Sequence, residues 1–126
     1  MFDQATVLLV EDDHEIRNVA SLRLRAAGYK TITAVDGEEG VRKAIGDLPD
    51  AIVMDVRMPK KDGMTALVEL KEQEETRNIP IVMLSAAIVD QQRALEAGAL
   101  FFLPKPYHGG DLLATVTAAI ERDPQN

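Results

Sequence analysis

Residues 51–63 read A-I-V-M-D-V-R-M-P-K-K-D-G, and this stretch decides the fold. Four apolar residues run without interruption into Asp55, after which Met58-Pro59 and Asp62-Gly63 turn the chain. A short, unbroken apolar run is typical of a strand buried on both faces of a parallel sheet. Asp55 therefore stands at the carboxyl end of a buried strand, where proteins with open parallel sheets bind their ligands.

Four further runs alternate with longer amphipathic segments along the chain. They are V-L-L-V (7–10), T-I-T-A (31–34), I-V-M-L (81–84) and L-F-F-L (100–103), and all but the second are almost wholly apolar. Strands that alternate with helices predict an α/β protein with right-handed crossovers. We expect a flavodoxin-like (βα)5 three-layer sandwich with a five-stranded parallel sheet in the order 2-1-3-4-5. Its ligand crevice would lie after the first and third strands.

The intervening segments repeat apolar residues at helical spacing. Gly28 is expected to end the first helix, and Asp36 to cap the second together with Glu39. Gly46 lies near the end of that second helix. The segment 90–97 is short and polar, and we expect it to form the loosest helix, with Ala94 and Leu95 offered for burial. The predicted inner faces of the other helices are Ile16, Val19, Ala20, Leu24 and Ala27; Met64, Leu67 and Val68; and Leu112, Leu113, Val116, Ala119 and Ile120.

Composition sets the class of protein. The 126 residues, 46% of them hydrophobic and 28% charged, predict one globular domain over 1–126, with a core at about 6–121 and a fraying tail at 122–126. The absence of cysteine excludes disulfides and thiol chemistry. With no signal-peptide pattern and no run of roughly 20 apolar residues, we expect a cytoplasmic protein without a membrane contact. The net charge of −7 argues against direct binding of nucleic acid.

Acidic residues follow the first and third strands. Glu11, Asp12 and Asp13 come directly after residues 7–10, and Asp55 follows residues 51–54. If the two strands are neighbours, these carboxylates repel one another across the crevice. A hard divalent cation relieves that repulsion, and Mg²⁺ suits a small open site with oxygen ligands. Asp13 is expected to cap the first helix as well.

Two further polar residues follow the fourth and fifth strands. Ser85 offers a hydroxyl group to a phosphoryl oxygen, and the small side chains of Ala86 and Ala87 leave room beside it. Lys105 offers a point charge to the same group and precedes Pro106, so a cis peptide bond is possible there. Asp55 could attack phosphorus to give an acyl phosphate.

Four motifs resemble a response-regulator receiver domain of the CheY-like, two-component type. They are L-L-V-E-D-D (8–13), V-M-D-V-R-M-P-K-K-D-G (53–63), I-V-M-L-S-A (81–86) and G-A-L-F-F-L-P-K-P-Y (98–107). The resemblance extends over nearly the whole chain, from Val7 to Ile120. It implies that Asp55 is the phosphoacceptor. Asp12, Asp55 and the backbone carbonyl of Arg57 would bind Mg²⁺, with Glu11 acting directly or through water.

The resemblance also implies how such a domain switches. Ser85 and Lys105 would sense the phosphoryl group, and Phe102 would be the aromatic residue that turns inward. The face formed by the fourth helix, fifth strand and fifth helix would then change, and a homodimer through this face is possible. The donor would be a phosphohistidine of a sensor histidine kinase or a histidine phosphotransfer protein. Such a domain is a phosphorylated switch, not an enzyme that turns over small substrates.

The chain departs from the family pattern in two ways. Ser85 and Lys105 are 20 positions apart, slightly fewer than is usual, which shortens the loop after the fourth strand. Arg57 is a large cation two residues after Asp55, and we expect it to alter dephosphorylation. It also argues against an aspartyl-nucleophile phosphatase, which needs a second Asp at this position.

Other interpretations remain open or are disfavoured. A flavin-binding protein of the same fold is disfavoured because Glu11, Asp12 and Asp13 would repel a phosphate after the first strand. Two alternatives stay open. The chain could be a receiver-like module that binds partners without phosphorylation, or a receiver cut from a larger regulator or hybrid kinase.

Overall fold

The computed structural model describes residues 4–122 and contains one parallel sheet. Its strands lie in the order β2-β1-β3-β4-β5, which confirms the predicted flavodoxin-like topology. The register pairs Val10 with Met54 and Asp55 with Leu84, so the carboxyl ends of β1, β3 and β4 meet at one edge. The strands are β1 (Thr6–Val10), β2 (Lys30–Ala34), β3 (Ala51–Asp55), β4 (Ile81–Ser85) and β5 (Phe101–Pro104).

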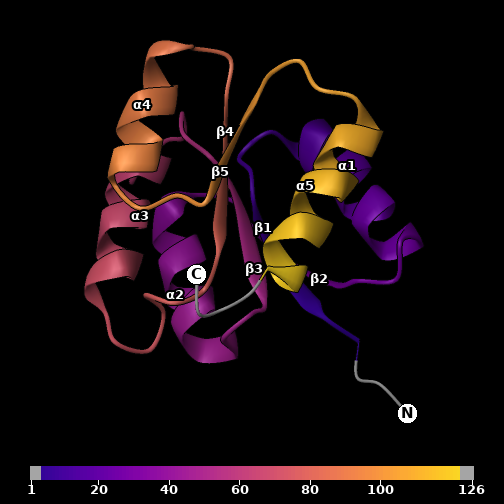
Figure 1. Ribbon diagram of the computed structural model, residues 1–126, viewed down its shortest axis with the longest axis horizontal. Helices are drawn as coiled ribbons and strands as arrows, with labels where there is room; N and C mark the ends of the chain where they lie inside the picture. The colour runs from indigo at the N-terminus through magenta and orange to yellow at the C-terminus, as the bar shows by residue number, and fades with distance from the viewer. Residues whose placement is uncertain (1–3, 123–126) are drawn as a thin grey trace.

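Helices cover both faces of the sheet and complete the three layers. In Figure 1, α2, α3 and α4 lie on one side, and α1 and α5 lie on the other. Each helix follows a strand, as parallel neighbours require a crossover. The helices are α1 (His14–Ala26), α2 (Gly37–Asp47), α3 (Gly63–Glu72), α4 (Val89–Glu96) and α5 (Gly109–Glu121).

Two separate apolar cores flank the sheet, because successive side chains of a strand point to opposite faces. Val7 and Leu9 of β1 pack with Leu24 of α1 and Val116 of α5. Leu8, the residue between them, belongs to the other core with α2, α3 and α4. The strands β1, β3 and β4 are almost entirely buried, which explains why their sequences are continuous apolar runs.

The predicted helix boundaries hold at three places. The carboxylate of Asp36 accepts a 2.8 Å hydrogen bond from the backbone N–H of Glu39 at the start of α2. Asp13 accepts a 2.9 Å bond from the N–H of Ile16 and caps α1. Gly28, with φ of 99°, follows the end of α1 in a conformation that favours glycine. Gly46 lies inside α2, and Leu48 with φ of 45° ends that helix.

Some predicted core positions are wrong. Ile16 and Val19 of α1 are 41% and 49% exposed, and Ala27 is also exposed. Only a narrow part of α1, at Ala20, Ser21 and Leu24, rests on the sheet. The helical period correctly indicates the inward side of a helix, but the neighbouring elements decide how wide the covered stripe is.

The same reason applies at the margins of α3, α4 and β5. Val68 and Leu95 are each 42% exposed, contrary to the prediction that both are buried. The apolar run at residues 100–103 is not buried on both faces, since Phe101–Leu103 are half-buried. β5 is an edge strand and has a neighbour on one side only.

The ends of the chain limit two further predictions. The predicted fraying tail at 122–126 falls outside the described residues except for Arg122, whose guanidinium donates to the backbone oxygens of Ala119 and Asn78. Among residues 4–122, no helix has the length and apolar character needed to cross a membrane.

Candidate functional site

Three carboxylates meet where β1 and β3 end. Glu11 and Asp12 follow β1, and Asp55 is the last residue of β3. One oxygen atom from each lies within 4.8 Å of the others. Glu11 and Asp55 are buried, whereas Asp12 is exposed, so the cluster opens to solvent on one side. The sequence prediction that these acids face one another is confirmed by this geometry.

Within this cluster, Glu11 has an unfavourable environment for a negative charge. Burial raises the pKa of Glu11 to about 7, and the nearby negative charge of Asp55 adds to the rise. The backbone N–H of Asp13 donates a 3.1 Å hydrogen bond to Oε2 of Glu11 and opposes the rise. A group of oxygens that resists carrying its full negative charge is one that a bound cation would stabilise.

Lys105 brings a cation to this cluster from the end of β5. Its Nζ atom lies 2.9 Å from Oδ2 of Asp55 and 3.3 Å from Oε1 of Glu11. Burial favours the neutral amine, but the hydrogen bond and charge of Asp55 outweigh it, so the pKa of Lys105 is above its ordinary value. The peptide bond between Lys105 and Pro106 is cis, the isomer that the sequence made possible.

The residues present fit a magnesium ion. Glu11, Asp12 and Asp55 offer only oxygen ligands, which Mg²⁺ prefers, and the exposure of Asp12 leaves room for waters. Lys105 offsets part of the negative charge of the cluster. The backbone carbonyl of Arg57 as a further ligand stays a prediction.

Glycine packing holds the loop that follows Asp55. The N–H of Gly63 donates a 2.8 Å hydrogen bond to the oxygen of Val56. A Cβ atom at Gly63 would overlap the backbone carbonyl oxygen of Asp55. The Asp62-Gly63 pair that the sequence indicated as a turn therefore lets α3 start directly against the residue at the centre of the site.

Ser85 ends β4 beside this cluster, and its hydroxyl has partners that the sequence did not suggest. Oγ of Ser85 donates a 2.6 Å hydrogen bond to Oδ2 of Asp90 and accepts a 3.0 Å bond from the N–H of Ala87. Asp90 in turn accepts two 3.1 Å bonds from Arg57. Sequence analysis placed Asp90 at the polar start of a weak helix and missed this role. The sequence offers no signal for this contact, because Ser85 and Asp90 lie on different elements.

Phe102 lies in β5, where it pairs with Met83 of β4. Its side chain is half-buried against the core on the α2–α4 side of the sheet. This position neither requires nor excludes the predicted turn inward, so the switch role of Phe102 stays a prediction.

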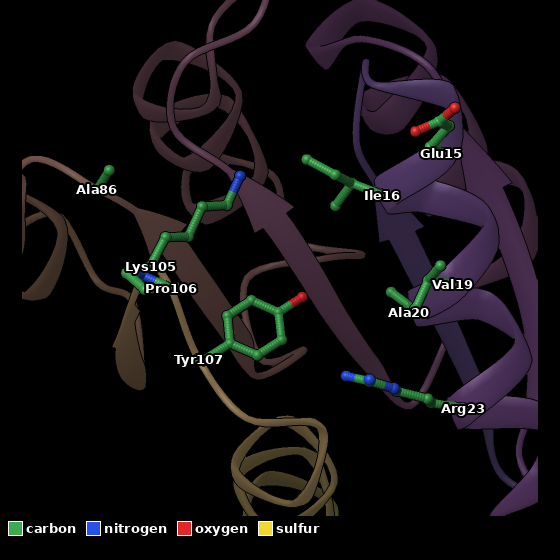
Figure 2. A pocket seen from close by; sticks show the side chains of 9 residues that line it. All are labelled: Glu15, Ile16, Val19, Ala20, Arg23, Ala86, Lys105, Pro106 and Tyr107. Atoms are coloured by element: carbon green, nitrogen blue, oxygen red, sulfur yellow. The ribbon is translucent and has the colours of Figure 1, made fainter.

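An apolar groove adjoins the site on the α1 side. Figure 2 shows Ile16 of α1 and Tyr107 of the loop before α5 extending into the same space, with Lys105 and Pro106 beside them. Ile16 and Val19, which were predicted to be buried, instead form one wall of this groove. The groove and the carboxylate cluster share Lys105. The lining residues are Glu15, Ile16, Val19, Ala20, Arg23, Ala86, Lys105, Pro106 and Tyr107.

Comparison with known proteins connects this arrangement to one family. The sequence model of the response regulator receiver domain family matches residues 7–117 of this chain. The receiver domain of the sensor histidine kinase PA1611 of Pseudomonas aeruginosa, solved with a magnesium ion coordinated in its active-site cleft, is 35% identical. The two structures superpose with a TM-score of 0.87 over 94% of this chain and 98% of that one.

Two relatives are longer proteins. The DNA-binding dual master transcriptional regulator RpaA of Synechocystis sp. is 37% identical over 118 residues, which are 92% of this chain and 49% of that protein. The transcriptional regulatory protein PrrA of Mycobacterium tuberculosis is 38% identical over 118 residues, 92% of this chain and 50% of that protein. The chain thus spans about half the length of these curated relatives.

Proposed function

This chain belongs to the family of response regulator receiver domains, and on that premise we propose that Asp55 is the phosphoacceptor of a Mg²⁺-dependent signalling switch. The observation that carries the proposal is the surrounding of Asp55. A buried carboxylate ends a central strand, has a lysine ammonium at 2.9 Å and shares a 4.8 Å cluster with two further acids. This is the charge arrangement that transfer of a phosphoryl group to a carboxylate requires.

The chemistry is one displacement at phosphorus. An oxygen of Asp55 forms a bond to phosphorus, the bond from phosphorus to the donor histidine nitrogen breaks, and the acyl phosphate remains on this chain. Lys105 is placed to move from Asp55 onto a phosphoryl oxygen. Magnesium held by Glu11, Asp12 and Asp55 would supply further positive charge for the transferred oxygens. Hydrolysis of the acyl phosphate returns the chain to its starting state.

We propose that Ser85 and Lys105 bind oxygens of the phosphoryl group. The side chain of Phe102 would then turn inward as Ser85 moves. Ser85 ends β4, and the preceding Leu84 pairs with Asp55 of β3, so Ser85 lies at the same edge of the sheet as the site. The output would be a population shift of the face formed by α4, β5 and α5. Ile88, directly before α4, and Val89 and Leu95 of α4 are exposed and offer an apolar surface for a homodimer.

The groove between α1 and Tyr107 is the proposed docking place of the phosphodonor. A phosphohistidine must approach Asp55 closely, and the groove reaches the site through Lys105. Its exposed Ile16 and Val19 suit the apolar face of a helix that carries the histidine. A sensor histidine kinase or a histidine phosphotransfer protein meets that description.

We propose that residues 6–121 form the functional unit, whether free-standing or within a regulator or hybrid kinase. Its partners would be proteins, because a net charge of −7 repels nucleic acid. RpaA is named as DNA-binding, but this chain spans only 49% of it. Any contact with DNA would therefore be made by other segments of such regulators.

Intact mass spectrometry after incubation with Mg²⁺ and acetyl phosphate tests the proposal. We expect one phosphoryl adduct on the wild type and none on Asp55→Ala. Asp47→Ala, which removes an exposed acid at the end of α2, is the matched control and should still be labelled. If neither acetyl phosphate nor a phosphohistidine donor gives the adduct, the proposal is wrong, and the alternative of a receiver-like module that binds partners without phosphorylation is favoured.

A further inference from the structure

Asp90 is a buried acid whose role the proposed chemistry does not include. It lies in the first turn of α4 and has 0% of its surface exposed. Burial of a carboxylate is costly unless charged or hydrogen-bonding groups compensate it. The compensating groups come from three places: Ser85 at the end of β4, Arg57 after β3, and Arg93 one turn along α4.

The bond from Ser85 occupies the only proton that its hydroxyl can donate. Oγ of Ser85 lies 2.6 Å from Oδ2 of Asp90, a short distance that indicates a strong bond to a charged acceptor. The backbone N–H of Ala87 donates to the same oxygen at 3.0 Å. Ser85 therefore cannot donate to a phosphoryl oxygen while it keeps Asp90 as its acceptor.

Arg57 holds the acceptor in place. Its Nε donates to Oδ2 of Asp90 and its Nη2 to Oδ1, both at 3.1 Å, so the guanidinium grips the carboxylate with two parallel bonds. Burial works against the charged form of Asp90, but the bonds from Ser85 and Arg57 and the charges of Arg57 and Arg93 outweigh it and lower the pKa of Asp90. The carboxylate thus stays charged and aimed at Ser85.

We propose that Asp90 is a positioning residue that holds the Ser85 hydroxyl in the unphosphorylated form and competes with the phosphoryl group for its proton. The inference rests on the proposed function of Asp55 and Ser85. Phosphorylation must break the hydrogen bond between Ser85 and Asp90. Because Asp90 belongs to α4, loss of this bond removes a contact that holds α4 to the end of β4. Asp90 acts through Ser85 and does not itself contact the reacting atoms.

The test measures binding of beryllofluoride, a phosphoryl mimic, at saturating Mg²⁺. The apparent Kd is obtained by nuclear magnetic resonance titration of backbone amides for the wild type, Asp90→Ala, Ser85→Ala and the double variant. We expect Asp90→Ala to lower Kd about tenfold, the size of one hydrogen bond to a charged group. In the Ser85→Ala background the same change should alter Kd by less than about twofold, since no hydroxyl remains to be released.

The Ser85→Ala background separates competition from simple electrostatics. Asp90→Ala also removes a negative charge, which favours any anion whether or not Ser85 is present. An equal decrease of Kd in both backgrounds, or no decrease in either, would overturn the inference. A wild type that does not bind beryllofluoride at all would overturn the proposed function first, so the two failures are distinguishable.

A conservative variant protects the test against a folding defect, and a second acid on α4 controls for loss of charge. Asp90→Asn removes the charge but keeps an acceptor oxygen, and we expect a smaller decrease of Kd than for Asp90→Ala. If Asp90→Ala shows no cooperative unfolding and is therefore not properly folded, the Kd values of Asp90→Asn and of Asp90→Asn/Ser85→Ala are compared in its place. Glu96→Ala removes an exposed acid from the same helix and should leave Kd within about twofold of the wild type.

Discussion

The ammonium of Lys105 lies 2.9 Å from Oδ2 of Asp55, although the two residues are 50 positions apart. The same ammonium is 3.3 Å from Oε1 of Glu11. Before phosphorylation, Lys105 thus places a positive charge against two of the three clustered carboxylates. Its charge supports acceptance of a phosphoryl group, but it opposes the binding of a metal ion by the same acids.

Replacement of Lys105 by Met should separate these two effects. The variant keeps most of the apolar stem and removes the charge, so we expect the Kd for Mg²⁺ to fall about tenfold, in line with one close charge interaction at high effective dielectric. Labelling by acetyl phosphate should decrease at the same time. Isothermal titration calorimetry and intact mass measure the two quantities. Lys30→Met, at the other end of the sheet, is the control and should change neither.

Magnesium should stabilise the fold through the carboxylate cluster. At a free concentration tenfold above Kd, binding to the folded state alone adds about 1.4 kcal/mol to the free energy of unfolding. We expect the Tm to rise with Mg²⁺ in the wild type and to fall back after a chelator is added. Asp12→Asn should lose most of this rise. Asp13→Asn should keep it, because asparagine caps α1 as well as aspartate does.

Arg57 should affect the lifetime of the acyl phosphate. Its guanidinium is hydrogen-bonded to Asp90, and we expect this large side chain, two residues after Asp55, to restrict the approach of water. We expect Arg57→Asn to shorten the lifetime several-fold, measured as loss of the phosphoryl mass after the donor is removed. An unchanged lifetime would remove this role of Arg57 and leave only its contact with Asp90.

The sequence was sufficient to predict the sheet and the edge where the chemistry lies. Strands such as β3 are buried on both faces, so their signal is a continuous apolar run that ends within one residue of the strand. Once strand order is known, the carboxyl ends of parallel strands must meet, which brings Asp12 and Asp55 together without any information about side-chain contacts. These predictions depend on the path of the backbone alone.

Asp90 could not be predicted in the same way. A polar residue in a polar segment indicates exposure. Burial of this acid is tolerable because α4 meets Ser85 at the end of β4 and Arg57 from another loop. The prediction that Ile16 is buried was wrong for a related reason, because helical periodicity does not distinguish a residue that faces the sheet from one that lines a groove. Contacts between distant elements decide both cases.

Gly63 should be intolerant of even one added carbon. A Cβ atom there would overlap the carbonyl oxygen of Asp55, so Gly63→Ala should lower the free energy of unfolding by about 2 kcal/mol or more and reduce labelling of Asp55. Gly46→Ala is the matched control, because its Cβ would meet no atom and alanine favours a helix. It should raise stability by about 0.5–1 kcal/mol. Equal stabilities of the two variants in urea unfolding would contradict the close packing of Gly63 against the backbone of Asp55.

The groove beside the site should matter to a protein donor but not to a small one. Ile16→Glu places a charge on the apolar wall, and glutamate is compatible with the first turn of α1. We expect transfer from a phosphorylated histidine phosphotransfer protein to slow at least about tenfold, as for a central interface residue. Labelling by acetyl phosphate should be unchanged, because that donor needs no docking surface.

Leu22→Glu is the control for this prediction. Leu22 is 66% exposed on the same helix and does not line the groove, so this variant adds the same charge to another side of α1. Its transfer rate should stay close to that of the wild type. If both variants slow transfer equally, the effect comes from the overall charge of the chain and the donor docks elsewhere. If only Ile16→Glu slows it, the apolar wall shared with Lys105 is the surface through which the phosphohistidine reaches Asp55.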